Sequence, residues 1–188
     1  CSVATKRTFV LYLLLFSGFE GPARAASGSA VWTPNSDHQT DLEHRRLDSV
    51  TYASSFESDF DSWTTSTFAR MSGSTPTSST GPSSAYDGSY YVFAETSDGG
   101  NPSVEFSVSR DFGDDVTSVS FQYHMYGETM GAALLQGSDD GGSTYTTLWS
   151  KSGNQGNAWY GAVVSVDSPR TQWLKFAYTS GSSYTGDF

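Results

Sequence analysis

Among the residues that could do chemistry, His124 comes first, because it is the one histidine from residue 56 to the end of the chain. A histidine can act as a general base when a carboxylate orients it, but the sequence identifies no such carboxylate. The chain also lacks the motifs His-Glu-x-x-His, Gly-x-Ser-x-Gly and Cys-x-x-Cys, and it has no phosphate-binding glycine loop. We therefore expect no catalysis. Because His124 alternates with Phe121 and Tyr123, we expect it on an outer or rim face, as scaffold or a surface contact.

The acidic run Asp139-Asp140-Gly141-Gly142 has two interpretations, a calcium loop and a hairpin turn. Calcium takes six to eight oxygen ligands, and an EF-hand loop of this kind ends in a glutamate at position twelve. Trp149 and Ser150 stand near that position instead. An Asp-Gly pair between two strands is typical of a hairpin. We therefore favour the turn.

A loop rich in glycine and amides, Ser152–Asn157, stands between Trp149 and Trp159. Amide groups such as those of Asn154 and Asn157 can bind sugar hydroxyls, and a tryptophan ring can stack on a sugar. Tryptophans at strand ends also serve as core anchors, because they bury a large area. We favour the scaffold role and keep these four residues as candidate binding residues.

The composition of the 188-residue chain argues against nucleic-acid and anionic membrane partners. It has 10 Lys and Arg against 20 Asp and Glu, for a formal net charge of −10. Such a balance does not supply the phosphate contacts that dominate nucleic-acid binding. Aromatic residues make up 15% of the chain, enough to build a core from few side chains. Cys1 is the single cysteine, so no internal disulfide can form.

The first 25 residues have the parts of a secretory signal peptide. Lys6 and Arg7 precede an apolar run, Phe9–Phe16, and the segment ends in Ala23-Arg24-Ala25. This run is too short to span a bilayer, which needs about 20 residues; a buried strand is the alternative. Residues 26–55 lack periodicity, and we interpret them as a linker or short pro-segment.

From Phe56 onward the residue pattern changes, and short aromatic or alternating segments recur between turn signals. No stretch has the apolar spacing of a helix. Many short strands separated by turns predict an all-β fold, an antiparallel β-sandwich or jelly roll. The expected strands are Tyr90–Glu95, Ser103–Ser109, Val119–Tyr126, Ala132–Gln136, Tyr145–Trp149, Trp159–Val166, which is nearly continuously apolar around Val163, and Trp173–Tyr178.

This region resembles the MAM domain, a family of extracellular adhesion-type modules with a concanavalin-like jelly-roll fold. The motifs are individually short, but they occur in the family's order from residue 56 to the end. They are Phe56-Glu57 with Trp63, Arg70–Pro76, Thr80–Ser84, Asp87–Tyr91, Phe121–Gly127, Leu148–Asn157 with Trp159, and Tyr184–Phe188.

The resemblance implies a MAM-like domain at residues 56–188, with two departures from the family. Animal members typically carry disulfides, and this region has no cysteine. Members also usually continue past the Gly-Asp-Phe motif into an acidic final strand. We therefore expect a domain that is incomplete at its C-terminus, with a sheet edge or a strip of core uncovered.

The resemblance also implies a structural calcium ion. Similar modules hold one with the glutamate of the Phe-Glu pair and oxygens near the Asp-Gly-Ser-Tyr turn. By this resemblance, Glu57 and Asp87 are the expected calcium ligands in this chain, and the remaining ligands are expected beyond Phe188. An exposed strand-end carboxylate is the alternative for Glu57. Asp59, Asp61 and Asp187 are further candidates.

These observations together predict a non-catalytic binding or adhesion module, secreted or on the extracellular face of the cell surface. Its expected partner is a protein surface, with a second copy of the domain among the options, or a glycan. The alternative function is a carbohydrate-binding accessory module of a secreted hydrolase or protease. No transmembrane segment is expected within these 188 residues.

Overall fold

The computed structural model describes residues 51–97, 103–167 and 170–188. Within these ranges all regular elements are β-strands, and no helix has the length and hydropathy needed to cross a bilayer. The expected signal peptide lies outside the described residues, as does most of the expected linker. The strands are β1 (Thr64–Thr65), β2 (Ala69–Ser72), β3 (Tyr90–Phe93), β4 (Glu105–Asp111), β5 (Ser118–His124), β6 (Ala132–Ser138), β7 (Thr146–Ser152), β8 (Trp159–Ser165) and β9 (Trp173–Thr179).

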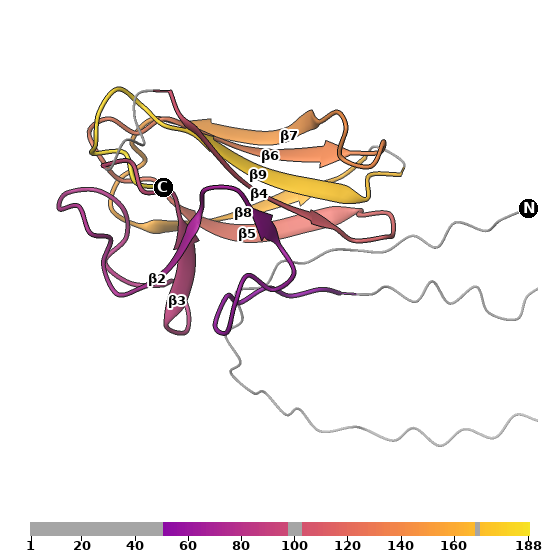
Figure 1. The fold of residues 1–188 in the computed structure, drawn as a ribbon, viewed down its shortest axis with the longest axis horizontal. Coiled ribbons are helices and arrows are strands. Elements are labelled where there is room, and N and C mark those ends of the chain that lie inside the picture. Colours follow the sequence, from indigo (N-terminus) through magenta and orange to yellow (C-terminus); the bar gives the residue numbers. More distant parts are fainter. Residues whose placement is uncertain (1–50, 98–102, 168–169) are drawn as a thin grey trace, which may run out of the picture.

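The described strands form three antiparallel sheets. The largest has five strands in the order β1-β4-β9-β6-β7, and the other two are the pairs β2-β3 and β5-β8. Figure 1 shows the β5-β8 pair as a layer facing the large sheet, with β2 and β3 beside it. The predicted antiparallel sandwich is confirmed.

All seven strands expected from the sequence are present, with ends that differ by a few residues. The sequence did not predict β1 and β2, which are two and four residues long. Such short segments contain too little alternation to stand out from a turn-rich background. They pair with β4 and β3 respectively, so longer strands determine their conformation.

The core lies between β5 and the large sheet. The alternation of β5 buries Val119, Phe121 and Tyr123 on one face, as predicted. The Phe121 ring meets the Phe176 ring of β9 edge-to-face at 4.9 Å and the Trp149 ring of β7 at 5.0 Å. Edge-to-face contacts at this spacing are favourable because the ring edge is positive and the ring face negative. Aromatic packing therefore joins the two layers.

Two side chains lie differently from expectation. His124 is on the face opposite Tyr123, but it is only 4% exposed rather than on an outer or rim surface. The Trp159 and Tyr126 rings, with centroids at 5.4 and 6.4 Å, help to cover it. Val163 is 79% exposed, so β8 is not a continuous apolar strand in the core. Its alternation buries Val164 and leaves Val163 in solvent.

The packed chain begins before Phe56, in the segment expected to be a linker. Ser54 is 2% exposed, and its hydroxyl accepts a hydrogen bond from the Trp63 indole N–H at 3.0 Å. Tyr52 meets the Phe112 ring edge-to-face at 5.7 Å. Residues on the linker side of the expected boundary therefore contribute to the fold.

The acidic run after β6 is a hairpin turn, as favoured from the sequence. Asp140 Oδ1 accepts hydrogen bonds from the Ser138 hydroxyl and the Ser143 and Thr144 N–H groups, and Oδ2 accepts one from the Thr144 hydroxyl. The bonds from Thr144 and Ser138 contribute most to lowering the pKa of Asp140 to about 2. Gly141 and Gly142 have φ of 75° and 82°, a region that glycine adopts at no steric cost. The Asp140 carboxylate is thus engaged by its own turn.

Tyr178 of β9 ties the end of the chain to the large sheet. It is fully buried, and its hydroxyl donates to the Gly186 carbonyl at 2.6 Å and accepts from the Gly131 N–H at 2.9 Å. Its ring stacks on Phe188 at 4.8 Å, with an interplanar angle of 12°. Burial raises the pKa of Tyr178 to about 12, so its hydroxyl keeps its proton at neutral pH.

The Tyr178→Phe variant should lower the free energy of unfolding by about 1–3 kcal/mol, because it leaves one buried and one partly buried main-chain group without their partner. Urea unfolding monitored by fluorescence measures the change. Tyr184→Phe is the matched control, because Tyr184 is 55% exposed, and it should leave the stability unchanged. Equal stabilities of the two variants would contradict this role for Tyr178.

Candidate functional site

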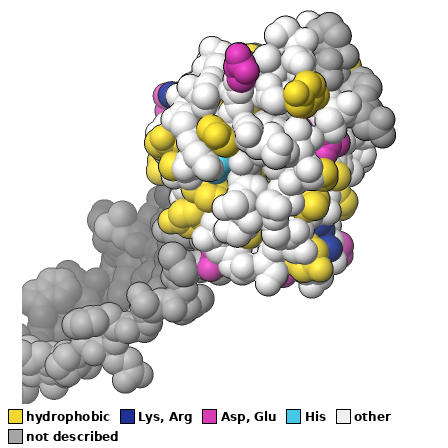
Figure 2. All heavy atoms as spheres, turned by 90° about the vertical axis from the view of Figure 1, so that its left-hand side faces the viewer, with side chains coloured by type: hydrophobic (Ala, Val, Ile, Leu, Met, Phe, Trp, Pro, Cys, Tyr) yellow, Lys and Arg dark blue, Asp and Glu magenta, His cyan; other side chains and the backbone are white. Residues whose placement is uncertain are grey.

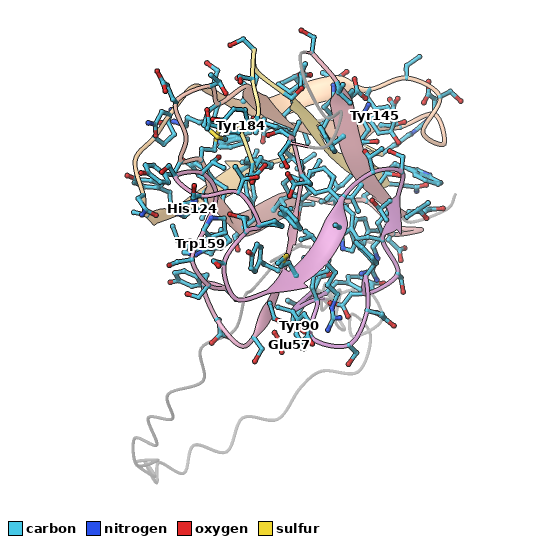
Figure 3. The ribbon with its side chains drawn as sticks, turned by 60° about the vertical axis from the view of Figure 1, so that its left-hand side comes forward. Glu57, Tyr90, His124, Tyr145, Trp159 and Tyr184 are labelled. Atoms are coloured by element: carbon cyan, nitrogen blue, oxygen red, sulfur yellow. The ribbon has the colours of Figure 1, made fainter. Side chains whose placement is uncertain are left out.

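Glu57, the first candidate metal ligand, joins the N-terminal segment to the start of β3. Its Oε1 atom accepts hydrogen bonds from the Ser89 and Tyr90 N–H groups, both at 2.9 Å. The Arg70 guanidinium donates to the Phe56 and Glu57 carbonyls and lies over the Tyr90 ring at 3.5 Å. Figure 3 shows Glu57 and Tyr90 side by side at one end of the molecule.

The surroundings of Glu57 favour its ionised form. The N–H groups of Tyr90 and Ser89, and then the Arg70 charge, lower the pKa of Glu57. A Cβ at Gly88 would lie 2.5 Å from Glu57 Oε1, so the turn accepts this carboxylate only because residue 88 is glycine. Gly88 also has φ of 64°. The Asp-Gly-Ser-Tyr motif is therefore built to receive the Glu57 side chain.

The described residues do not by themselves complete a calcium site at Glu57. Calcium takes six to eight oxygen ligands, and one Glu57 oxygen already accepts two N–H groups. Within residues 51–97, 103–167 and 170–188, no group of three or more His, Cys, Asp or Glu side chains could hold a metal ion. Asp87 precedes Gly88 in the same turn. A calcium ion held by Glu57 and Asp87 stays a prediction.

Trp149, a candidate sugar-binding residue, packs into the core. Its ring meets the Phe121 and Tyr123 rings at 5.0 Å in each case, both edge-to-face. Phe121 and Tyr123 point from β5 toward the large sheet, so Trp149 lies between the two layers. Its position fits the core-anchor role that we favoured from the sequence.

Trp159 belongs to a different cluster, on the other face of the β5-β8 pair. It is the cross-strand neighbour of His124, and its ring also lies 6.1 Å from the Tyr91 ring and 6.3 Å from the Tyr86 ring. Its indole N–H donates to the Ser84 carbonyl at 3.1 Å. Figure 3 shows His124 and Trp159 together, far from Glu57. The two tryptophans therefore do not form one stacking platform.

The amides between the tryptophans mostly stabilise their own loop. Asn154 Oδ1 accepts from the Gly156 N–H at 2.9 Å, and the Gln155 amide donates to the Ser152 and Gly153 carbonyls. The Asn157 Oδ1 atom lies 3.1 Å from His124 Nε2. Figure 2 shows a face of the molecule where hydrophobic side chains are scattered and only a few charged side chains are present.

His124 has the surroundings of a structural histidine. Burial lowers its pKa, so the ring is neutral at neutral pH, and Nε2–H can donate to Asn157 Oδ1. The Nδ1 atom is buried and has no hydrogen-bond partner among the described residues. A general base needs a group that orients it and a reachable substrate proton. The described contacts of His124 are instead aromatic rings and an amide.

Asp187 is a buried acid, and the sequence indicated it only as a further candidate metal ligand. It is 0% exposed, and Oδ1 accepts from the Thr96 N–H at 2.9 Å and from the Thr96 hydroxyl at 3.0 Å. Within the described part of the chain, Asp187 Oδ2 and Glu95 Oε2 are buried without hydrogen-bond partners. Burial raises the pKa of Asp187 to about 6, and the Glu95 carboxylate adds to the rise. No sequence pattern links residues 95 and 187.

The raised pKa of Asp187 makes stability depend on pH. A carboxyl with a raised pKa in the folded state binds its proton there first. Its contribution to stability is therefore complete below the ordinary value of 3.8 and is lost as pH rises through about 6. His124 opposes this trend, because its lowered pKa makes the unfolded state take up the proton first as pH falls through 6.5.

Comparison of the wild type with Asp187→Asn isolates the acid, since His124 is common to both. The free energy of unfolding of the wild type, relative to the variant, should fall by up to about 3 kcal/mol between pH 4 and pH 7, at about 1.4 kcal/mol per pKa unit. Urea titrations at several pH values measure it. Glu95→Gln should weaken the trend. A difference that stays constant with pH would contradict the assignment.

Glu57→Ala should lower the melting temperature, because the Ser89 and Tyr90 N–H groups lose a charged acceptor. Gly88→Ala should lower it as well, by displacing the same carboxylate, whereas Ser83→Ala, a change at an exposed position, should not. Melting in calcium and in chelator tests the metal prediction. If Glu57 also binds calcium, the ion raises the melting temperature of the wild type and Glu57→Ala removes the gain.

Comparison with known proteins adds relatives of this chain. It is 36% identical over 115 residues to the Homo sapiens "MAM domain-containing glycosylphosphatidylinositol anchor protein 1", covering 57% of this chain and 12% of that protein. The Gallus gallus protein of the same name is 36% identical over 121 residues, covering 59% and 12%. The match thus spans a small part of these relatives.

A solved structure has the same type of fold. It is described as "Crystal Structure Analysis of the K2 Cleaved Adhesin Domain of Lys-gingipain (Kgp)", with a TM-score of 0.50, 15% identity, and coverage of 68% of this chain and 83% of that one. At this identity the likeness concerns the fold alone. The family model "MAM domain, meprin/A5/mu" matches residues 48–188, well over half of the sequence. The chain therefore belongs to the MAM domain family.

Proposed function

We propose that this chain is a non-catalytic binding module that works outside the cell and contacts a protein surface. The observation that carries the proposal is the match to MAM proteins whose name includes a glycosylphosphatidylinositol anchor. Such an anchor is a lipid attachment that takes the place of a membrane-spanning helix, and it holds a protein on the outer face of the cell. Residues 1–25, with the features of a signal peptide, are in keeping with that location.

The geometry supports binding more than catalysis. The described residues contain no cluster of three or more His, Cys, Asp or Glu side chains that could hold a metal. His124 is neutral, covered by aromatic rings, and bonded to an amide. The two most perturbed acids, Asp140 and Asp187, are engaged by their own turn and by Thr96. None of these groups combines reactivity with open access.

The best candidate for the contact is strand β8, which exposes Val163 and Tyr160 at 79% and 38%. Tyr160 lies on the face of Tyr123, whereas Val163 lies on the other face of the strand together with Gly161 and Ser165, which are also exposed. We call Gly161, Val163 and Ser165 the β8 surface. Although the chain has a net charge of −10, the sequence of β8 contains no charged residue. Protein interfaces are depleted of charge at their centre. The β8 surface has this composition.

A carbohydrate-binding accessory module is the alternative, and the structure gives it less support. Trp149 is packed between the layers, and the Trp159 N–H already bonds to the Ser84 carbonyl. The Asn154 carbonyl oxygen bonds within its own loop. A sugar site would need at least one aromatic face and several amides free at the same place.

Fluorescent beads coated with this chain test the function on cultured cells. We expect adhesion that trypsin treatment of the cell surface abolishes and glycosidase treatment preserves. Val163→Asp should weaken adhesion, because it places a charge in the apolar contact. Tyr184→Ser is the matched control, an exposed aromatic residue away from β8, and should adhere normally. Mixing two batches of coated beads tests whether a second copy is the partner.

Two results would contradict the proposal. Adhesion that resists trypsin, is lost after glycosidase treatment and is reduced by Trp159→Ala without loss of folding would support the carbohydrate-binding alternative. Adhesion no greater than that of uncoated beads would argue against a cell-surface protein partner of any kind.

A further inference from the structure

Strand β8 has one edge that no other strand uses. Within the described residues, β8 pairs only with β5, over its whole length and without a register shift. The N–H and C=O groups that point away from β5 therefore belong to no ladder among these residues, and such a free edge is a template for another strand. The last residues lie elsewhere, because Phe188 exchanges both main-chain hydrogen bonds with Ala94, which follows β3.

The edges of the large sheet have features that hinder pairing with another strand, and β8 has none of them. Strand β1 is only two residues long. Strand β7 carries Lys151, and its extra residue Leu148 accompanies a shift in the register with β6. Short length, lysine and bulges are common means of protecting an edge strand. Strand β8 has seven residues and contains no charge, no proline and no bulge, so its edge is left open to pairing.

Charge favours β8 as a place where two copies of the chain can meet. Because each copy carries a net charge of −10, two copies repel each other at long range. Neither β8 nor the adjacent β5 contains an acidic or basic residue. On the outer face, Ser120 and Gln122 of β5 stand opposite Val163 and Gly161, and the Gln122 amide comes close to Gly161. Two copies can therefore approach along β8 without bringing like charges into contact.

The sequence of β8 fits a second copy of itself in the antiparallel orientation. Ala162 is the midpoint of the strand, so a two-fold axis at this residue gives the longest possible ladder. In this register Val163 of each copy lies opposite Gly161 of the other, where no side chain competes for the space. Tyr160 lies opposite Val164, which pairs two apolar side chains on the other face. Opposed residues of an antiparallel pair share a face and make its closest side-chain contacts.

We propose that two copies of this chain pair edge to edge through β8, with antiparallel strands and a two-fold axis at Ala162. The β5-β8 pairs of the two copies then form one continuous four-stranded sheet. Main-chain hydrogen bonds along the edge supply the affinity, and the opposed side chains fix the register. The β8 surfaces of both copies lie side by side on the outer face of this sheet.

This inference goes beyond the proposed function, because pairing uses the main-chain edge of β8 and adhesion uses its outer face. The two can fail separately. A chain that dimerises but does not adhere to cells would contradict the adhesion proposal alone, and a monomeric chain that adheres would contradict the dimer alone.

Sedimentation equilibrium of the 188-residue chain over a range of concentrations tests the dimer. We expect a reversible dimer that becomes tighter as salt screens the repulsion between the two acidic copies. Val163→Lys and Val163→Glu should each weaken it about tenfold, because residues 163 of the two copies are diagonal neighbours and would carry like charges. An equimolar mixture of these two variants should recover the dimer, since the charges are then opposite. Thermal melting confirms that the variants fold.

Ser150→Glu is the matched control, because it adds a charge at an exposed position of β7, an edge strand of the large sheet. It should dimerise like the wild type. A chain that stays monomeric at the highest concentration measured would overturn the proposal. A dimer that neither Val163 variant weakens, or one that Ser150→Glu weakens equally, would overturn it as well.

Cross-linking tests the register. The two copies of Ala162 should lie directly opposite each other, with Cβ atoms about 4.5–5.5 Å apart, close to the separation in a disulfide. In a chain with Cys1→Ser, Ala162→Cys should therefore form a covalent dimer on mild oxidation, whereas Ser150→Cys should remain largely monomeric. Failure of the cross-link at residue 162, or equally ready cross-linking at residue 150, would contradict the proposed pairing.

Discussion

The contact between the Phe121 ring and the rings of Phe176 and Trp149 is the interaction on which the rest of this fold depends. Among the described residues, the β5-β8 pair shares no hydrogen-bonded ladder with the large sheet. Side-chain packing must therefore hold the two layers together, helped by loops such as the one from Met125 to Met130. A single cysteine rules out an internal disulfide. The chain meets this constraint with large rings, which bury much area per residue.

The need for aromatic packing between the layers explains where the candidate sugar-binding tryptophans lie. Trp149 is partly buried against the core, where its ring contacts Phe121 and Tyr123, so part of the ring is engaged by the scaffold. Trp159 covers His124 on the other face of β5 and fixes the loop at Ser84. Both tryptophans have scaffold contacts, on opposite faces of one strand pair. Among the large hydrophobic side chains of the described residues, the most exposed, Val163, lies on β8.

Much of the fold could be predicted because alternation is local. The pattern of Val119, Phe121 and Tyr123 indicates a half-buried strand without knowledge of its partners. Burial of the other face of β5 depends on residues that are distant in the sequence. The local pattern therefore predicts a rim position for His124, although a loop and Trp159 cover it. The proximity of Glu95 and Asp187 depends on residues 92 positions apart. Glu57 could be proposed as a site residue only because its motif resembles that of a known family. Its hydrogen bonds with the Ser89 and Tyr90 N–H groups could be identified only in the structure.

The two layers of the sandwich are built differently among the described residues. The five-stranded sheet has three internal strands, and its edges are β1 and β7. The opposite layer consists of the pairs β2-β3 and β5-β8, and its strand β8 has no charged residue and exposes Val163. The hydrogen-bonded ladders of the large sheet fix the fold, whereas the side chains on the outer face of β8 are not needed for packing between the layers. The protein contact that we propose therefore belongs to the layer that contains β8.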